Sequence, residues 1–277
     1  MHKFVCLLFF IFVVLGIGSC SYYYQHQQMT DDQNVKVKPV EKPEIYTTQT
    51  PPDFLAIHNI RERKLAFLNY LRPGIDYENQ RISEERYFLQ SVEQSVTHQQ
   101  SLSQSEMKRL SVISREYKLP LPETGPDEGW FQKAFHRVDI LPEALVFIQA
   151  ANESAWGTSR FARQGNNYFG QWCYRRGCGL VPLARTEGAT HEVAKFGSVQ
   201  ESIHRYFMNV NRNKAYTALR EIRFNLRQQG VNIRTSQSAA ELTNGLLKYS
   251  ERGAEYVDSL KTMIRHNQKI LPDNEPG

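Results

Sequence analysis

Hydrophobic residues along most of this chain recur every three or four positions, which is the spacing of an amphipathic helix. Between residues 54 and 119 this pattern defines three segments, and Pro73-Gly74 and a Gln- and Ser-rich run near residues 94–105 are predicted to separate them. The apolar positions are Leu65, Phe67, Leu68 and Leu71, then Ile82, Tyr87, Phe88 and Val92, then Met107, Leu110, Ile113 and Tyr117. No catalytic grouping occurs among them, so we expect a helical appendage over residues 53–119.

Prolines at 120, 122 and 126 mark a boundary, and the domain that carries the chemistry is predicted over residues 120–277. Its first clear element is an apolar run from residue 144 to 155, which leaves little polar face and so predicts a central, buried helix. Gly157 is predicted to end this helix, and Thr158 or Ser159 to cap a second, short one.

The helical pattern is interrupted once, between Trp172 and Phe196, by glycines, a proline and β-branched residues. A turn at residues 188–190 predicts a short hairpin there, after which amphipathic helices resume. The expected fold class is mainly α (α+β), with a small β-hairpin lobe beside a cleft and the helical appendage at its N-terminal side.

Composition supports a folded protein, because 40% of the 277 residues are hydrophobic and 12% are aromatic. Charge is nearly balanced overall, with 34 basic and 29 acidic residues, but residues 153–234 hold 13 Lys and Arg against 5 Glu and no Asp. This basic island indicates either attraction to an anionic partner or a solvated helical surface.

The first residues resemble a bacterial lipoprotein signal. Lys3 precedes the apolar run Phe4–Ile17, which is too short to span a bilayer, and small residues lead to Cys20. The resemblance implies a signal peptide over 1–19, a lipid on Cys20 and a polar, proline-dotted tether over 20–52. We expect a lipid-anchored protein of the bacterial cell envelope that faces the periplasm, and Ser21 favours the outer membrane by resemblance to sorting rules. Plain secretion and an uncleaved signal anchor are the alternatives.

On the lipoprotein interpretation Cys6 would leave with the signal and Cys20 would be acylated, so that Cys173 and Cys178 are left as a pair in an oxidising compartment. They are predicted to form a disulfide, with two unlinked thiols as the alternative. Their spacing lacks the second ligand pair of a zinc site, and His191 and His204 have no metal-ligand spacing. No nucleotide or phosphate motif occurs, so we expect no cofactor, no metal and no nucleic acid partner.

Glu153 stands near the end of the apolar helix, where burying a carboxylate is costly. It is either a surface or salt-bridged residue, or a catalytic acid. Glu187 and Glu192, in the hairpin, are available for the opposite wall of the cleft. An acid kept protonated by apolar surroundings and a second group to stabilise or activate is the arrangement that glycoside hydrolysis requires.

The sequence around these residues resembles that of a known family. The stretches "AANESAWGTSRFAR" and "NNYFG" are similar to the acidic-helix and Asn-Leu-Phe-Gly motifs of the peptidoglycan β-N-acetylglucosaminidases, glycoside hydrolase family 73, with Tyr168 where leucine is common. The cysteine pair and the stretches "KFGSVQESIHRYF", "NKAYTAL", "RKLAFLNYLRP" and "RISEERYFL" resemble its Bax-type subgroup, from about residue 63 to the last helix.

The resemblance implies a lysozyme-like fold and cleavage of the glycan strand on the reducing side of N-acetylglucosamine, with Glu153 as the general acid. The second group is left open between Glu187, Tyr216 and assistance by the substrate's acetamido group, and Glu192 competes if the hairpin register shifts. Candidates for stacking on sugars are Trp156, Tyr168, Phe169 and Trp172, which otherwise fill the core. Asn167 is a candidate for binding the N-acetyl group or for holding the turn.

Two other functions remain open at this point. A lytic transglycosylase shares the fold and the single acid but leaves an anhydro-muramyl end, and an inactive glycan-binding or scaffolding lipoprotein would bind without cleaving. The motifs favour the glucosaminidase. The expected partners are peptidoglycan glycan strands and, through Cys20, a membrane, and we expect a monomer.

The lipoprotein interpretation predicts that protein extracted from membranes begins at a lipidated Cys20. Intact mass spectrometry of the extracted protein measures this directly. An N-terminus at Met1, or an unacylated cysteine, would refute the anchor, and a Cys20→Ser variant is the matched control because it should stay unprocessed.

Overall fold

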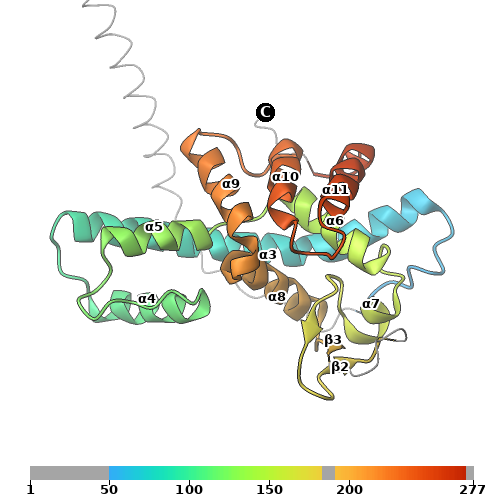
Figure 1. Ribbon diagram of the computed structural model, residues 1–277, viewed down its shortest axis with the longest axis horizontal. Coiled ribbons are helices and arrows are strands. Elements are labelled where there is room, and N and C mark those ends of the chain that lie inside the picture. The colour runs from blue at the N-terminus through green and yellow to red at the C-terminus, as the bar shows by residue number, and fades with distance from the viewer. Residues whose placement is uncertain (1–49, 183–190, 273–277) are drawn as a thin grey trace, which may run out of the picture. The chain divides into compact units, whose positions relative to one another are not determined.

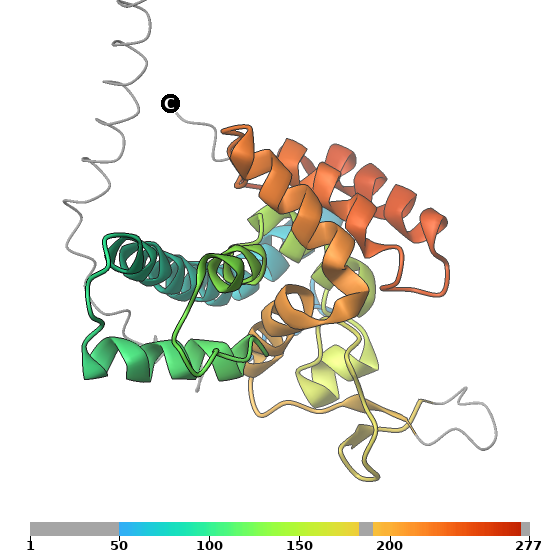
Figure 2. The same ribbon diagram turned by 60° about the vertical axis from the view of Figure 1, so that its left-hand side comes forward.

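The computed structural model describes residues 50–182 and 191–272. Their helices and strands are α3 (Ile60–Thr97), α4 (Gln104–Glu116), α5 (Glu128–Arg137), α6 (Glu143–Ser154), α7 (Arg160–Gly165), β1 (Trp172–Cys173), β2 (Gly179–Leu180), β3 (Glu192–Ala194), α8 (Val199–Arg212), the 3-10 turn η1 (Lys214–Tyr216), α9 (Thr217–Gln228), α10 (Ser236–Leu242), the 3-10 turn η2 (Thr243–Leu246) and α11 (Ala254–Asn267). Figures 1 and 2 show a body of helices from which the β lobe projects at one side. The predicted class, mainly helical with a small antiparallel sheet, is confirmed.

Helix α6 lies at the centre of this body. Its apolar residues from Ala144 to Ala151 are almost completely buried, and α3, α10 and α11 pack around it. A helix that is apolar on every side is stable only when other elements cover all its faces, so the prediction of a central helix is confirmed.

Helix α3 corrects the predicted separation at Pro73-Gly74. The helix runs unbroken for 38 residues with Pro73 inside it. A proline within a helix costs about 3 kcal/mol, but Leu71 and Ile75 on either side are fully buried, and their packing outweighs that cost.

One hydrophobic core joins the two predicted segments of the chain. Phe54, Phe67 and Leu71 belong to the same buried cluster as residues of the last helix, such as Leu260 and Ile264. Residues 53–119 therefore pack into the core that contains α6, and a division of the chain near residue 120 stays a prediction.

The β lobe is a three-stranded antiparallel sheet in the order β1-β3-β2. Gly179 pairs with Ala194, and a Cβ at Gly179 would lie 1.9 Å from the carbonyl oxygen of Val193, so only glycine fits there. The predicted disulfide between Cys173 and Cys178 is present, with 6.2 Å between its Cα atoms. The predicted turn at residues 188–190 lies outside the described residues.

Within the described ranges, no helix combines the length and the apolar character that crossing a bilayer requires. The apolar run Phe4–Ile17 and Cys20 lie outside those ranges.

The buried carboxyl of Glu143 at the start of α6 lies near the exposed carboxylate of Asp76 in α3, and this arrangement predicts a pH-dependent stability. Burial and the nearby charge of Asp76 raise the pKa of Glu143 to about 7, against the opposing effect of Arg72 and Arg234. Because the folded-state pKa is above the unfolded one, the stabilisation is complete at low pH and is lost as the pH rises through about 7.

We expect Glu143→Gln to remove this loss, since an amide donates to Asp76 at every pH. Urea unfolding at pH 5.5 and pH 8.5 should give a wild-type difference in free energy, of at most about 3 kcal/mol, that the variant lacks. An equal pH dependence in both proteins would contradict the assignment.

Candidate active site

Glu153 occupies the last turn of α6, where the chain reverses sharply. Ala155, Trp156 and Gly157 follow with φ of 50°, 57° and 80°, so the helix ends at Ser154, three residues before the predicted glycine. Left-handed backbone at a residue as bulky as Trp156 is strained and persists only where the surroundings impose it. The reversal is held by Ser154, whose hydroxyl donates to the carbonyl of Ala150 and accepts from the N–H of Gly157.

Two donors hold one oxygen of the Glu153 carboxyl. The hydroxyl of Tyr256 donates to Oε1 at 2.8 Å, and Nδ2 of Asn152 donates to the same atom at 3.1 Å. Tyr256 in turn accepts from Nε2 of Gln149 at 3.1 Å, and the hydroxyl of Tyr206 donates to Oε1 of Gln149. A relay of hydrogen bonds therefore runs from α8 through α6 to α11 and fixes the carboxyl plane.

The second oxygen of the carboxyl, Oε2, lies against Gly170. A Cβ at that position would come within 2.9 Å of Oε2, and the φ of Gly170 is +62°. Both the closeness and the backbone conformation require glycine here. Because Oε1 already accepts two hydrogen bonds, the proton of the neutral acid resides on Oε2.

The surroundings of Glu153 favour that neutral form. Burial raises the pKa of its carboxyl, and the hydrogen bonds from Tyr256 and Asn152 offset only part of this effect. A carboxylic acid that keeps its proton nearer neutral pH is suited to general acid catalysis.

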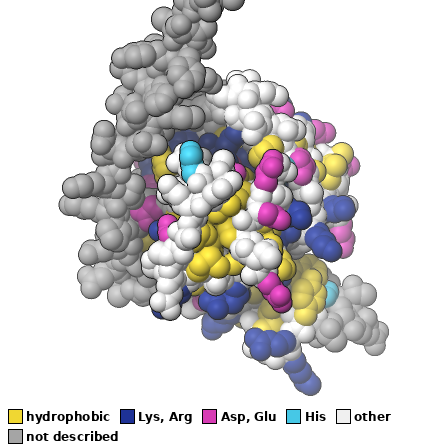
Figure 3. Space-filling model, turned by 90° about the vertical axis from the view of Figure 1, so that its left-hand side faces the viewer, with side chains coloured by type: hydrophobic (Ala, Val, Ile, Leu, Met, Phe, Trp, Pro, Cys, Tyr) yellow, Lys and Arg dark blue, Asp and Glu magenta, His cyan; other side chains and the backbone are white. Residues whose placement is uncertain are grey.

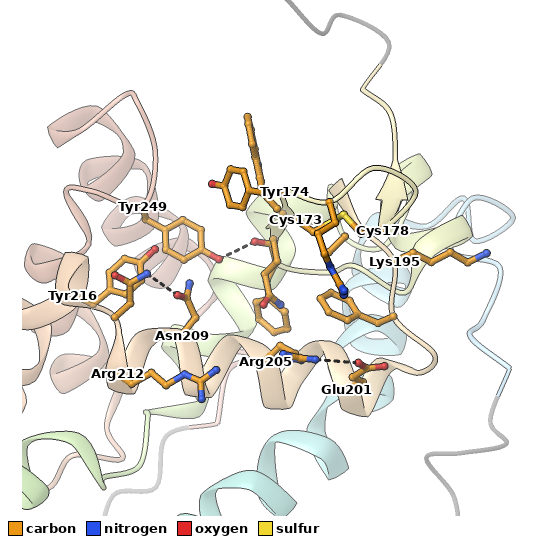
Figure 4. Close-up of a pocket in the computed structure, with 18 of the residues that line it drawn as sticks. Cys173, Tyr174, Cys178, Lys195, Glu201, Arg205, Asn209, Arg212, Tyr216 and Tyr249 are labelled. Atoms are coloured by element: carbon orange, nitrogen blue, oxygen red, sulfur yellow. Dashed lines mark hydrogen bonds and ion pairs between the residues drawn. A yellow bond between two sulfur atoms is a disulfide. The ribbon is translucent and has the colours of Figure 1, made fainter. Parts of the chain in front are cut away.

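A groove with a cavity volume of about 1160 Å³ lies beside the acid. It is lined by Gly170, by Tyr216 and Tyr249, and by residues of β1 and α8 (Figure 4). Glu153 is not itself in the lining but stands next to it. Gly170, which lines the groove, lies against Oε2, and the ring of Tyr249 stacks parallel to that of Tyr256 at 5.6 Å.

Tyr216 faces this groove, as the predicted assignment to the site requires. Its ring lies 5.8 Å from that of Tyr249, whose hydroxyl donates to the carbonyl of Phe169. Burial raises the pKa of Tyr216, a hydrogen bond with Asn209 lowers it, and the charge of Glu153 raises it again. The structure thus brings Tyr216 and Glu153 to the same groove. Glu187 lies outside the described residues.

Glu192 serves the β lobe instead of the groove. Its buried carboxylate accepts from the N–H of Gly177 at 2.9 Å and from that of Gly179 at 2.8 Å. These bonds tie the disulfide loop to β3. Glu192, Cys173 and Cys178 also form a group close enough for a metal ion, but both sulfurs are joined in the disulfide and are not available as thiolate ligands.

The five predicted sugar-binding residues have different surroundings. Trp172 lines the groove and is 51% exposed, with its ring stacked on His191 at 3.9 Å. Phe169 also borders the groove, but its ring is buried and stacks on Tyr206 at 4.2 Å. Trp172 is therefore the better platform for a sugar ring.

The other three face protein. Tyr168 is buried beside Phe67, and Trp156 packs edge-on against the same ring. Asn167 is buried, donates to the carbonyls of Gln171 and Ala194, and accepts from the N–H groups of Phe169 and Gln171. Its amide holds the turn, which is one of the two roles left open by the sequence.

Sequence reasoning missed Tyr249 and Tyr256, which shape the site, and Tyr174, which is 77% exposed at the rim of the groove. The aromatic residues of "LLKYSERGAEY" fit the buried face of the last helical region equally well, so no local pattern distinguishes a catalytic environment from a core position.

Comparisons with known proteins cover this site. A family model described as mannosyl-glycoprotein endo-beta-N-acetylglucosaminidase matches residues 129–269. "Protein bax" of Escherichia coli (strain K12) is 33% identical over 220 residues, which is 79% of this chain and 75% of that protein. No solved structure matches the chain. The matched residues include Glu153, Gly170, Tyr216, Tyr249 and Tyr256.

The hydrogen bond from Tyr256 predicts a measurable change in the acid. Tyr256→Phe removes a donor to the charged carboxylate, so the pKa of Glu153 should rise further above its usual value. A titration of labelled glutamate carboxyl carbons by NMR measures the shift, and Glu153→Gln identifies the signal.

Tyr249→Phe is the matched control, because that hydroxyl donates to the carbonyl of Phe169 and not to Glu153. It should leave the titration of Glu153 nearly unchanged. Equal shifts in the two variants would show that the relay does not hold the carboxyl.

Proposed function

Because the chain belongs to the glucosaminidase family, we propose that it is a peptidoglycan endo-β-N-acetylglucosaminidase with Glu153 as its general acid. It hydrolyses the glycan strand on the reducing side of N-acetylglucosamine. The observation that carries the proposal is the partly buried carboxyl beside the groove, with a raised pKa and with the hydrogen bonds from Tyr256 and Asn152 both on Oε1.

The chemistry follows from that geometry. A sugar bound in the groove beside Gly170 presents its glycosidic oxygen to Oε2 of Glu153, which donates its proton as the bond to the anomeric carbon breaks. Water then adds to the anomeric carbon, and the product is a reducing N-acetylglucosamine end. Glu153 recovers its proton from solvent.

Two residues are candidates for the group that assists the attack. Tyr216 lines the same groove, with its hydroxyl kept protonated because burial raises its pKa. Glu187 belongs to the segment between β2 and β3, outside the described residues. Glu192 is a weaker candidate, because its carboxylate accepts the two N–H bonds of the disulfide loop.

We also propose that the protein works in the bacterial cell envelope, anchored by a lipid on Cys20. The disulfide between Cys173 and Cys178 supports this location, because such bonds persist in oxidising compartments. Peptidoglycan is present in the same compartment.

The test is the identity of the cleaved bond. Purified peptidoglycan is digested, reduced with borohydride and examined by mass spectrometry, and we expect reduced N-acetylglucosamine at the new ends. Glu153→Gln should lower the rate about 10²–10⁴-fold, since an amide has no proton to give. Anhydro-muramyl ends would establish a lytic transglycosylase, muramyl reducing ends a muramidase, and binding without cleavage a scaffold.

Glu143→Gln is the matched control for the acid, because it makes the same change in the other glutamate of α6, which is buried in its first turn. It should keep the wild-type rate below pH 7. Tyr216→Phe and Glu187→Gln separate the candidates for the second group, since only the variant of the group that assists should lose activity while binding persists.

A further inference from the structure

The groove is lined by far more positive than negative side chains. One carboxylate, Glu201, is among its lining residues. Seven cations line it: Lys118, Arg137, Arg175, Lys195, Arg205, Arg212 and Lys214. A neutral glycan strand gives no reason for this charge, because sugars are bound by hydrogen bonds and by stacking.

Helix α8 places some of these positive side chains along the groove. Arg205, Asn209 and Arg212 are spaced four and three residues apart, so they lie on one face of the helix, and Figure 4 shows them side by side along the groove. Arg205 is paired with Glu201 at 3.8 Å at the end near the β lobe. Figure 3, a view of one face of the molecule, shows Lys and Arg side chains in dark blue over the lower part of that face and along its right-hand side.

Four cations gather at the other end of the groove, and we name Lys118, Arg137, Arg212 and Lys214 the cation cluster. Arg137 Nη1 donates to the carbonyls of Tyr117 and Lys118, and Arg212 Nη1 donates to the carbonyl of Glu116. These bonds orient both guanidinium groups at the C-terminal end of α4 without pairing them with a carboxylate. No carboxylate oxygen among residues 50–182 and 191–272 lies within 4 Å of the nitrogen atoms of the cluster.

A further cation stands behind the cluster. The buried Arg220 donates to the carbonyls of Val210 and Asn213, next to Arg212 and Lys214. Burial lowers its pKa to about 10 and the charge of Arg137 lowers it as well, against the opposing charge of Glu221. Like charges so close together repel one another, and an anion bound among them would remove that repulsion.

We propose that the cation cluster binds the carboxylates of the peptide stems on the glycan strand, so that the enzyme selects peptide-bearing strands over neutral ones. The inference rests on the proposed function, because peptidoglycan stems are short peptides with carboxylates that project from the muramyl sugars. The cluster lies in the same groove as Tyr216 and Tyr249, beside the acid, so a strand seated for cleavage places a neighbouring stem there. An anionic membrane surface fits less well, since the cations line a concave groove.

The test compares two forms of one substrate. Soluble strands with free stem carboxylates are set against the same strands after carbodiimide coupling to ammonia, which turns those carboxylates into amides. The wild-type protein, extracted in detergent, should show a KM several-fold higher for the amidated strands, with kcat changed less. Equal KM values would overturn the proposal.

A double variant locates the effect in the groove. Lys118→Gln with Lys214→Gln removes two exposed lysines of the cluster, and the KM for native strands should rise about three- to tenfold. The KM for amidated strands should stay near the wild-type value. Lys108→Gln with Lys269→Gln makes the same change in net charge at exposed positions outside the groove lining and should alter neither KM. Equal effects of the two double variants would show general attraction and overturn the proposal.

A binding measurement distinguishes a failure of this inference from a failure of the proposed function. The Glu153→Gln protein should bind native strands more tightly than amidated ones in calorimetry, whether or not the wild-type protein cleaves them. If the wild type cleaves both forms equally and Glu153→Gln binds both equally, the stem inference fails and the glucosaminidase stands. If nothing is cleaved but native strands bind preferentially, the glucosaminidase fails and the inference stands. Loss of binding to anionic vesicles alone in the Lys118→Gln, Lys214→Gln variant would assign the cluster to a membrane.

Discussion

A carboxyl group at the end of an almost completely buried helix is the constraint on which this structure depends. Helix α6 can be buried only if each polar side chain that it carries finds a partner, since an unpaired buried polar group costs roughly 1–3 kcal/mol. Gln149, Glu153 and Ser154 find theirs in α8, in α11 and in the turn that follows α6. The packing of the helices and the geometry of the acid are therefore one arrangement.

Tyrosines make the connection between the core and the groove. Tyr206 and Tyr256 reach α6 through their hydroxyl groups, while Tyr249 and Tyr216 continue the aromatic layer to the groove. Burial raises the pKa of each, so that each keeps its proton and remains a donor. This layer excludes water from one side of Glu153, which accounts for the raised pKa of the acid, and leaves the Gly170 side next to the groove.

The β lobe and α8 supply the other wall of the groove. Glu192 fastens the disulfide loop by two backbone bonds, which lets a lobe of very short strands keep its shape next to the groove. Opposite the lobe, α8 presents the charged side chains of Arg205 and Arg212 and the amide of Asn209. The groove thus combines aromatic surface and a row of cations beside an acid of raised pKa. These features match the sugar ring, the anionic stem and the glycosidic bond of a peptidoglycan strand.

Local patterns in the sequence were sufficient for the helices, the small β lobe, the disulfide and the position of Glu153 at the end of the apolar helix, because each depends on residues near one another in the chain. They failed at Pro73, where packing on both sides of α3 outweighs the preference of proline to end a helix. Local patterns also could not distinguish a catalytic role of Glu192 from its role in holding the disulfide loop by hydrogen bonds. Only tertiary structure decided that Tyr256, 103 residues away, would hold Glu153 and that Gly170 would lie against Oε2. It also decided that cations from three helical regions would meet in one groove. The reason is that such contacts are set by how helices pack, and no periodicity along the chain records which distant side chains that packing brings together.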